Sequence, residues 1–132
     1  MVGLATAEVA AAVIEADGRY LITRREKGHL EGFWEFPGGK LRPGETLSEC
    51  LRRELKEELG VEISVGEKLE TVSWRYPERT VVLHFFHCNL IGGPVVPQEG
   101  QAVAWATPEE LEGYPFPPAD ASLIRRLRGT PS

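Results

Sequence analysis

The first third of the chain alternates apolar runs with turn residues, which predicts a β-hairpin followed by a short strand. Residues 8–15 form an apolar run, Asp17-Gly18 has the composition of a hairpin turn, and residues 19–24 predict a second strand. The first run is apolar at most positions, which is typical of a strand buried on both faces. Residues 33–36 predict a brief aromatic strand that stops at Pro37-Gly38-Gly39, a turn signal.

The clearest periodic pattern lies between residues 47 and 59. Leucine recurs there at intervals of four, which predicts one buried stripe along a helix. The stripe consists of Leu47, Leu51, Leu55 and Leu59. Thr46 and Glu49 have the spacing of a capping box, and Gly60 favours the left-handed conformation that ends a helix. We therefore expect a helix over residues 47–59.

The second half of the chain predicts a long antiparallel hairpin, one more strand and two short helices. The expected strands are 61–65, 69–76, 80–90 and 101–106, and the expected helices are 107–111 and 119–127. Strands and helices do not alternate regularly, so the pattern excludes a Rossmann unit. The elements together predict a mixed α/β (α+β) sheet with a helix on each side. Trp34, Trp74 and Trp105 are expected in core or sheet packing rather than in base stacking.

Composition and charge narrow the class of protein. The length of 132 residues and the apolar content of 42% predict a single globular domain, 1–132. The net charge of −5 argues against a nucleic-acid polymer as partner. Cys50 and Cys88 lack zinc-site spacing, which fits free thiols in a reducing compartment. Without a long apolar run or a signal-peptide pattern, we expect a cytoplasmic monomer with no membrane contact.

Three carboxylates crowd one face of the expected helix. Glu54, Glu57 and Glu58 stand at positions i, i+3 and i+4, where like charges repel and destabilise a helix. A hard divalent cation would make the arrangement favourable. Mg²⁺ takes oxygen ligands of this kind and shares its shell with water and phosphate. The spacing therefore predicts a magnesium site that serves a phosphorylated substrate.

The same stretch resembles the Nudix box at every position. The matching positions are Gly39, Glu45, Arg53-Glu54-Leu55, Glu57-Glu58 and Gly60-Val61. The resemblance implies the Nudix fold, an α/β/α sandwich in which helices enclose a mixed β-sheet. It also implies Mg²⁺-dependent hydrolysis, with Mn²⁺ as a substitute, of a nucleoside diphosphate linked to another group. Neither a GxGxxG pattern nor a GxxxxGK[ST] loop is present.

Motifs outside the box are similar to the MutT branch of that family. They are 22–25 (Ile-Thr-Arg-Arg), 35–40 (Glu-Phe-Pro-Gly-Gly-Lys), 76–79 (Tyr-Pro-Glu-Arg), 99–101 with Trp105, and 116–120 (Phe-Pro-Pro-Ala-Asp). MutT-type members cleave nucleoside triphosphates to the monophosphate and pyrophosphate, through attack of water on the β-phosphorus. Their best-known substrate is 8-oxo-dGTP, and removing it cleans the nucleotide pool that supplies DNA synthesis.

The resemblance also implies roles for individual residues. The metal ligands would be the Gly39 carbonyl, Glu54, Glu57, Glu58 and Glu99. Glu54 would be the catalytic base, Glu45 would assist it, and Arg53 would hold the carboxylates in place. Arg25 and Lys40 would face the phosphates, and Phe36, Arg79 and Asp120 would face the base. His29 is either an ordinary loop residue or a further substrate contact.

Asp120 leaves the preferred base open. MutT proteins that prefer 8-oxo-guanine carry asparagine there, whereas relatives that prefer cytidine triphosphates carry Pro-Ala-Asp, as this chain does. An ionised aspartate only accepts hydrogen bonds, so an amino group of cytosine or adenine, or the N7–H of 8-oxo-guanine, suits it. We rank 8-oxo-dGTP first and CTP, dCTP or 5-methyl-dCTP second. A non-catalytic nucleotide-binding module is third, and Asp120 serving only as a helix cap is a further alternative.

Overall fold

The computed structural model describes residues 5–129; the expected domain also includes residues 1–4 and 130–132, which lie outside them. The strands are β1 (Ala5–Ala16), β2 (Arg19–Arg24), β3 (Trp34–Glu35), β4 (Gly38–Lys40), β5 (Glu62–Arg75), β6 (Arg79–Gly92) and β7 (Val103–Ala106). The helices are α1 (Leu47–Leu59), α2 (Pro108–Leu111), the 3-10 turn η1 (Pro118–Asp120) and α3 (Ala121–Leu127). Within residues 5–129, no helix is both long and apolar enough to cross a bilayer.

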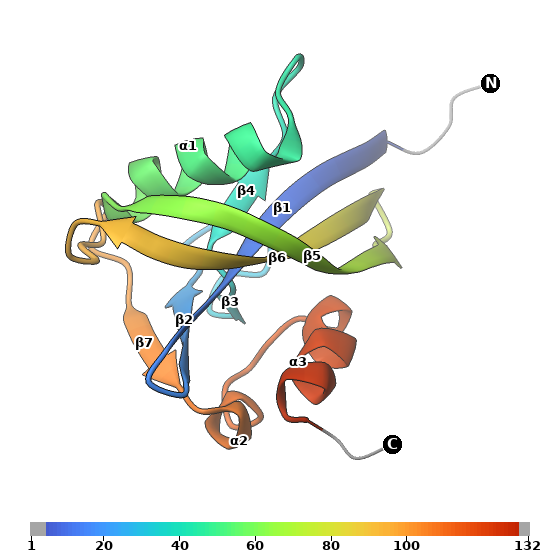
Figure 1. Cartoon of the computed structure of the whole chain (residues 1–132). Coiled ribbons are helices and arrows are strands. Elements are labelled where there is room, and N and C mark those ends of the chain that lie inside the picture. Colours follow the sequence, from blue (N-terminus) through green and yellow to red (C-terminus); the bar gives the residue numbers. More distant parts are fainter. Residues whose placement is uncertain (1–4, 130–132) are drawn as a thin grey trace.

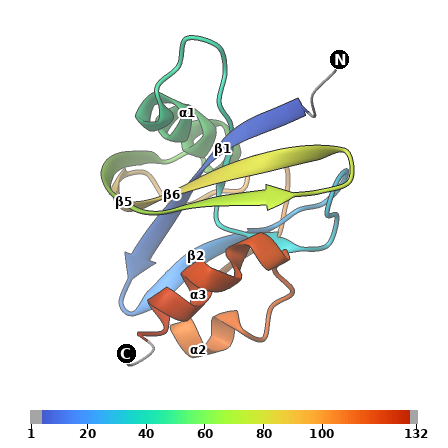
Figure 2. The ribbon, with the colours of Figure 1, turned by 90° about the vertical axis from the view of Figure 1, so that its right-hand side faces the viewer.

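The strands form a mixed sheet with β1 at its centre. β1 runs antiparallel to β2 and β4 and parallel to β6, while β5 pairs with β6 and β7 pairs with β2. Helix α1 covers one face, and α2 and α3 lie on the other (Figures 1 and 2). The arrangement is the α/β/α sandwich that the sequence predicts, including the opening hairpin.

Helix α1 has the predicted bounds and both predicted ends. Its Thr46 side chain accepts a hydrogen bond from the Glu49 amide, and the Glu49 side chain returns one to the Thr46 amide. Gly60 adopts the left-handed conformation at φ 66°. Leu51, Leu55 and Leu59 are fully buried against the sheet, because one helical face is apolar. Cys50 and Cys88 are buried there as free thiols.

Three details differ from the sequence prediction. Residues 38–40, expected as a turn, form β4, because their backbone pairs with β1. Gly38 makes this pairing possible, since a Cβ atom there would overlap the carbonyl of Ala10. Strand β5 is continuous, whereas the pattern predicted two segments, and its register with β6 shifts on either side of Lys68. Trp74 is 37% exposed on β5, so of the two expected placements, core or sheet, it has the sheet and not the core.

Candidate active site

The pairing of β4 with β1 brings a glycine against a glutamate of α1. A Cβ atom on Gly39 would overlap the carboxylate of Glu54, so the glycine gives that side chain its room. The Gly39 carbonyl also lies 3.5 Å from the Cys50 Sγ, one helical turn before Glu54. The predicted glycine and the first predicted glutamate therefore meet at the edge of the sheet.

Arg53 connects four of the groups in this region. Its Nε and Nη2 donate to the two carboxylate oxygens of Glu45 at 2.6 and 3.0 Å. Its Nη1 lies 3.1 Å from Glu54 Oε2 and 3.3 Å from Glu57 Oε1, and its Nη2 lies 3.1 Å from the Lys40 carbonyl. The hydrogen bonds from Arg53 lower the pKa of Glu45 to about 2. Arg53 thus fixes the carboxylates relative to β4.

An acidic cleft of about 720 Å³ opens beside α1. Its walls include all four of the predicted carboxylates, namely Glu54, Glu57, Glu58 and Glu99. The loop that carries Glu99 reaches the end of α1 because the Gln98 amide and the Gln101 side chain both donate to the Glu58 carbonyl, at 2.9 and 3.2 Å. Within residues 5–129, no three His, Cys, Asp or Glu side chains are arranged closely enough to bind a metal ion as they stand.

Glu58 has the most perturbed carboxyl group of the cleft. Burial raises its pKa to about 9, and the neighbouring carboxylate of Glu54, which is hydrogen-bonded to it, adds to the rise. Two carboxyl groups that share a hydrogen bond must hold a proton between them. A divalent cation would replace that proton and stabilise both charges, so the set of oxygen donors fits a hard cation.

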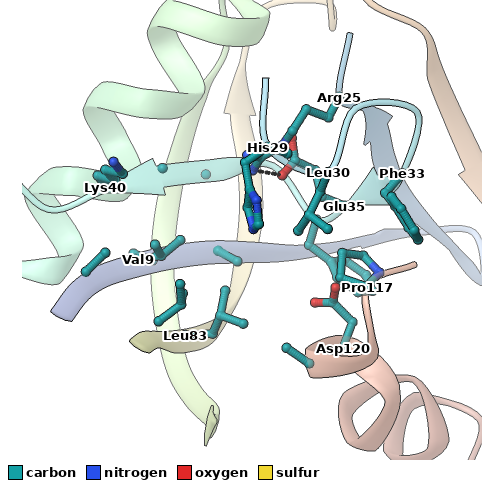
Figure 3. Close-up of a pocket in the computed structure, with 18 of the residues that line it drawn as sticks. Val9, Arg25, His29, Leu30, Phe33, Glu35, Lys40, Leu83, Pro117 and Asp120 are labelled. Carbon is teal, nitrogen blue, oxygen red and sulfur yellow. Dashed lines mark hydrogen bonds and ion pairs between the residues drawn. The ribbon is translucent and has the colours of Figure 1, made fainter. Parts of the chain in front are cut away.

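A second cavity, of about 160 Å³, lies next to the acidic cleft and is mainly apolar. Val9, Leu83, Phe36 and Pro117 line it together with the predicted residues His29 and Asp120. Phe36 is buried and stacks on Phe116, with ring centroids 5.5 Å apart. In Figure 3 the Asp120 carboxylate points toward the cavity that His29 and Leu83 also line. We call this cavity the apolar pocket.

One ion pair borders both cavities. Arg25 and Glu35 line the apolar pocket and also the acidic cleft, and Arg25 Nη2 lies 2.6 Å from Glu35 Oε1 (Figure 3). Glu35 was not among the predicted site residues. Its alternation with Trp34 and Phe36, which pack into the core, was the available signal, because a strand points such a residue to the other face.

Asp120 is buried at the start of α3. The residue is 5% exposed and stands at the N-cap position, but its side chain makes no capping hydrogen bond, which argues against the alternative that it serves only as a helix cap. Burial raises the pKa of Asp120 to about 7, and the charge of Glu35 adds to the rise. Its carboxyl lines the apolar pocket, where it is available to a bound molecule.

A NUDIX domain profile matches residues 9–126, which is most of the chain. The chain belongs to the Nudix hydrolase family. It is 42% identical to the CTP pyrophosphohydrolase of Escherichia coli (strain K12), over 89% of this chain and 87% of that protein. It is 37% identical to the 8-oxo-dGTP diphosphatase of Haemophilus influenzae, over 91% of this chain and 90% of that protein.

Solved structures agree with the Nudix assignment. The crystal structure of the MutT protein from Methanosarcina mazei Go1 matches with a TM-score of 0.86 at 25% identity, covering 98% of this chain and 97% of that one. The resemblance to MutT-like Nudix hydrolases and the predicted fold are therefore confirmed. The roles of the individual residues stay predictions.

Some Nudix residues lie elsewhere than their expected roles suggest. Both oxygens of Glu45 bind Arg53, and Glu45 does not line the acidic cleft, so Arg53 connects it to Glu54 and Glu57. Lys40 was expected near the phosphates, but it lines the apolar pocket and not the acidic cleft. Arg79 lines the apolar pocket, as expected for a neighbour of the base.

Replacing Asp120 with asparagine is expected to stabilise the chain near pH 8. The carboxyl has an ordinary pKa of 3.8 and a folded pKa of about 7, so between these values the folded state binds more protons than the unfolded state. The native free energy of unfolding therefore falls as pH rises through that window. At about 1.4 kcal/mol per pKa unit, the variant gains on the order of 2–4 kcal/mol at pH 8. Urea unfolding at high and low pH measures this, and equal gains at both would contradict it.

Proposed function

We propose that this Nudix hydrolase is a divalent-cation-dependent nucleoside triphosphate pyrophosphohydrolase, which releases the nucleoside monophosphate and pyrophosphate. The observation that carries the proposal is that Arg25 and Glu35 line both cavities, which places the apolar pocket beside the acidic cleft. An apolar pocket with one buried carboxyl suits a nucleobase, and the adjoining acidic cleft suits phosphates accompanied by a cation. The relatives named for nucleotide hydrolysis support the same reading.

The cation would be held by oxygen atoms of the acidic cleft. Glu54, Glu57, Glu58 and Glu99 supply carboxylates, and Gly39, whose α-carbon lies against the Glu54 carboxylate, would add its backbone carbonyl. Mg²⁺ is the natural ion for this set, and Mn²⁺ is its substitute. The bound cation would neutralise phosphate charge and lower the pKa of water.

Individual side chains would activate the attacking water, position the base and contact the substrate. Glu54 orients the attacking water and accepts its proton, because its carboxylate stands between Gly39 and Glu58 at the centre of the site. Arg53 keeps Glu54 in that orientation through the 3.1 Å contact. Arg25, at the junction of the two cavities, lies where the sugar and phosphates of a nucleotide would meet.

The base is read by Asp120, and the balance of observations favours cytosine over oxidised guanine. The sequence alone ranked 8-oxo-dGTP first. The 42% identity to a CTP pyrophosphohydrolase, set beside 37% to an 8-oxo-dGTP diphosphatase, supports the second candidate instead. An Asp120 carboxyl with a pKa of about 7 can donate as well as accept, which matches the N3 acceptor and N4 amino donor of cytosine. CTP, dCTP or 5-methyl-dCTP is therefore the first substrate class and 8-oxo-dGTP the second.

A panel of triphosphates tests both the reaction and the base. We expect kcat/KM for dCTP or CTP to exceed that for dGTP by about 100-fold with Mg²⁺. Chelation of the cation should abolish turnover, and Asp120→Asn should shift the preference toward 8-oxo-dGTP. Release of pyrophosphate and monophosphate, separated by ion-exchange chromatography, reports the reaction.

Three outcomes separate the candidates. A preference for 8-oxo-dGTP over dCTP would show that the sequence-based ranking of substrates, with 8-oxo-dGTP first, is correct. Release of inorganic phosphate in place of pyrophosphate would contradict the proposed bond cleavage. No turnover of any triphosphate, even with Mn²⁺, would favour a nucleotide-binding module without catalysis.

A further inference from the structure

The C-terminal helix is fastened to the edge of the sheet by two polar contacts. The Ser122 hydroxyl donates to Glu70 Oε1 at 3.1 Å, and the Arg126 guanidinium donates to the Leu69 carbonyl. Ser122 and Glu70 are both partly buried, so water does not freely replace their bond. Both contacts lie within two turns of Asp120 along the chain. We call these contacts the β5 clamp.

An irregularity in β5 makes the clamp possible. Lys68 pairs with Phe86 and Glu70 pairs with Phe85, so two steps along β5 match one step along β6. The extra residue is Leu69. A bulge of this kind bends a strand and re-aims its side chains. Glu70 would otherwise stand opposite His84 and face α1, because side chains alternate along a strand. The bulge turns the Glu70 side chain to the face of the sheet that α3 covers, where it contacts Ser122.

The segment before Asp120 is fixed by separate contacts. The Trp34 amide donates to the Pro115 carbonyl at 2.8 Å, and Phe116 stacks on Phe36. The Asp120 side chain makes no capping hydrogen bond to α3. Its buried carboxyl therefore depends on the contacts that anchor the chain before and after it. After Asp120 these are the buried Leu123 and Ile124 and, as polar contacts, the β5 clamp.

We propose that Ser122 and Glu70 are positioning residues that hold Asp120 against the base. This inference rests on the proposed function, because it assigns the clamp to base selection by the same pocket. Leu123 and Ile124 keep α3 packed on the sheet, but without the Ser122 hydroxyl its first turn loses the polar contact to β5, and the Asp120 carboxyl gains access to water. Selection between bases then weakens, while the acidic cleft, whose carboxylates lie mainly on α1, keeps its geometry.

A titration of the free protein tests the clamp without any substrate. Asp17 and Asp120 are the two aspartates of the chain, so carboxyl labelling of aspartate gives two signals, with exposed Asp17 as the reference. In Ser122→Ala the titration midpoint of Asp120 should fall by at least about one pH unit as water reaches it. Ser122→Thr keeps the hydroxyl and should keep the native midpoint. An unchanged Asp120 midpoint in Ser122→Ala overturns the inference.

Kinetics with the triphosphate panel supply the second readout. Ser122→Ala should reduce the preference between bases about tenfold, mainly through KM, and leave kcat for the best substrate within about twofold. In Asp120→Asn, the same change should have no further effect on preference, since the clamp acts through Asp120. An equal loss for all bases would indicate a general structural role and overturn the inference. Failure of the native chain to hydrolyse any triphosphate would refute the proposed function instead, and the titration would still decide on the clamp.

Discussion

Replacing Glu54 with glutamine is expected to lower kcat by about 1000-fold, because the amide can neither accept the proton of water nor supply a charged ligand. Glutamine has nearly the same volume, so it fits beside Gly39, and the fold should persist. Steady-state rates of pyrophosphate release at saturating Mg²⁺, together with thermal unfolding, measure the two effects separately.

Glu67→Gln is the matched control for this variant. Glu67 is exposed on β5 and lines neither cavity, so the same chemical change there should leave kcat unaltered. Near-native activity in Glu54→Gln would assign the base to another carboxylate of the acidic cleft. A large loss of thermal stability in Glu54→Gln would mean that the lost rate reports folding instead of chemistry.

Replacing Gly39 with alanine is expected to lower kcat by about 100-fold with little change in stability. The added Cβ would occupy the space of the Glu54 carboxylate, so that side chain must rotate away from its present position. It can do so because the acidic cleft lies open beside it. The measurement is kcat together with the midpoint of thermal unfolding.

Gly38 provides the comparison, because the same substitution one residue earlier meets backbone. A Cβ on Gly38 would overlap the Ala10 carbonyl oxygen and lie 2.8 Å from the Cα of Ala11. Backbone in the middle of a sheet cannot give way, so Gly38→Ala should reduce the free energy of unfolding by at least about 3 kcal/mol. If the two alanine variants lost stability equally, the Gly39 substitution would be acting on β4 pairing and not on Glu54.

The sequence predicted correctly those helices and strands whose determining residues all lie within the element or next to it. Helix α1 was predicted to the residue, because its leucine stripe, its capping box and Gly60 all lie inside it. Strand β4 was missed, since Gly38, Gly39 and Lys40 resemble a turn, and only pairing with β1, nearly thirty residues away, makes them a strand. The exposure of Trp74 was missed for a similar reason. Its position on the outermost strand, β5, depends on the strand order.

The candidate site also has parts that local sequence predicts and parts that depend on contacts between distant residues. The carboxylates of α1 were predictable from spacing, because i, i+3 and i+4 positions share a helical face. The pairing of Glu45 with Arg53 was not predictable, because it depends on how the loop of residues 41–46 folds back on the helix. The Arg25–Glu35 ion pair links the loop after β2 to β3, and Asp120 enters the same pocket from the opposite end of the chain.

The different linings of the two cavities have a consequence for how such a protein can diversify. The carboxylates proposed to hold a cation lie mainly on α1, whereas Asp120 and the β5 clamp involve the last elements of the chain. Changes at well-separated positions tend to combine additively. Substitutions between residues 112 and 129 can therefore alter the preferred base step by step without disturbing the hydrolytic centre. A single ancestral hydrolase could in this way give rise to paralogues that share one reaction and guard against different nucleotides.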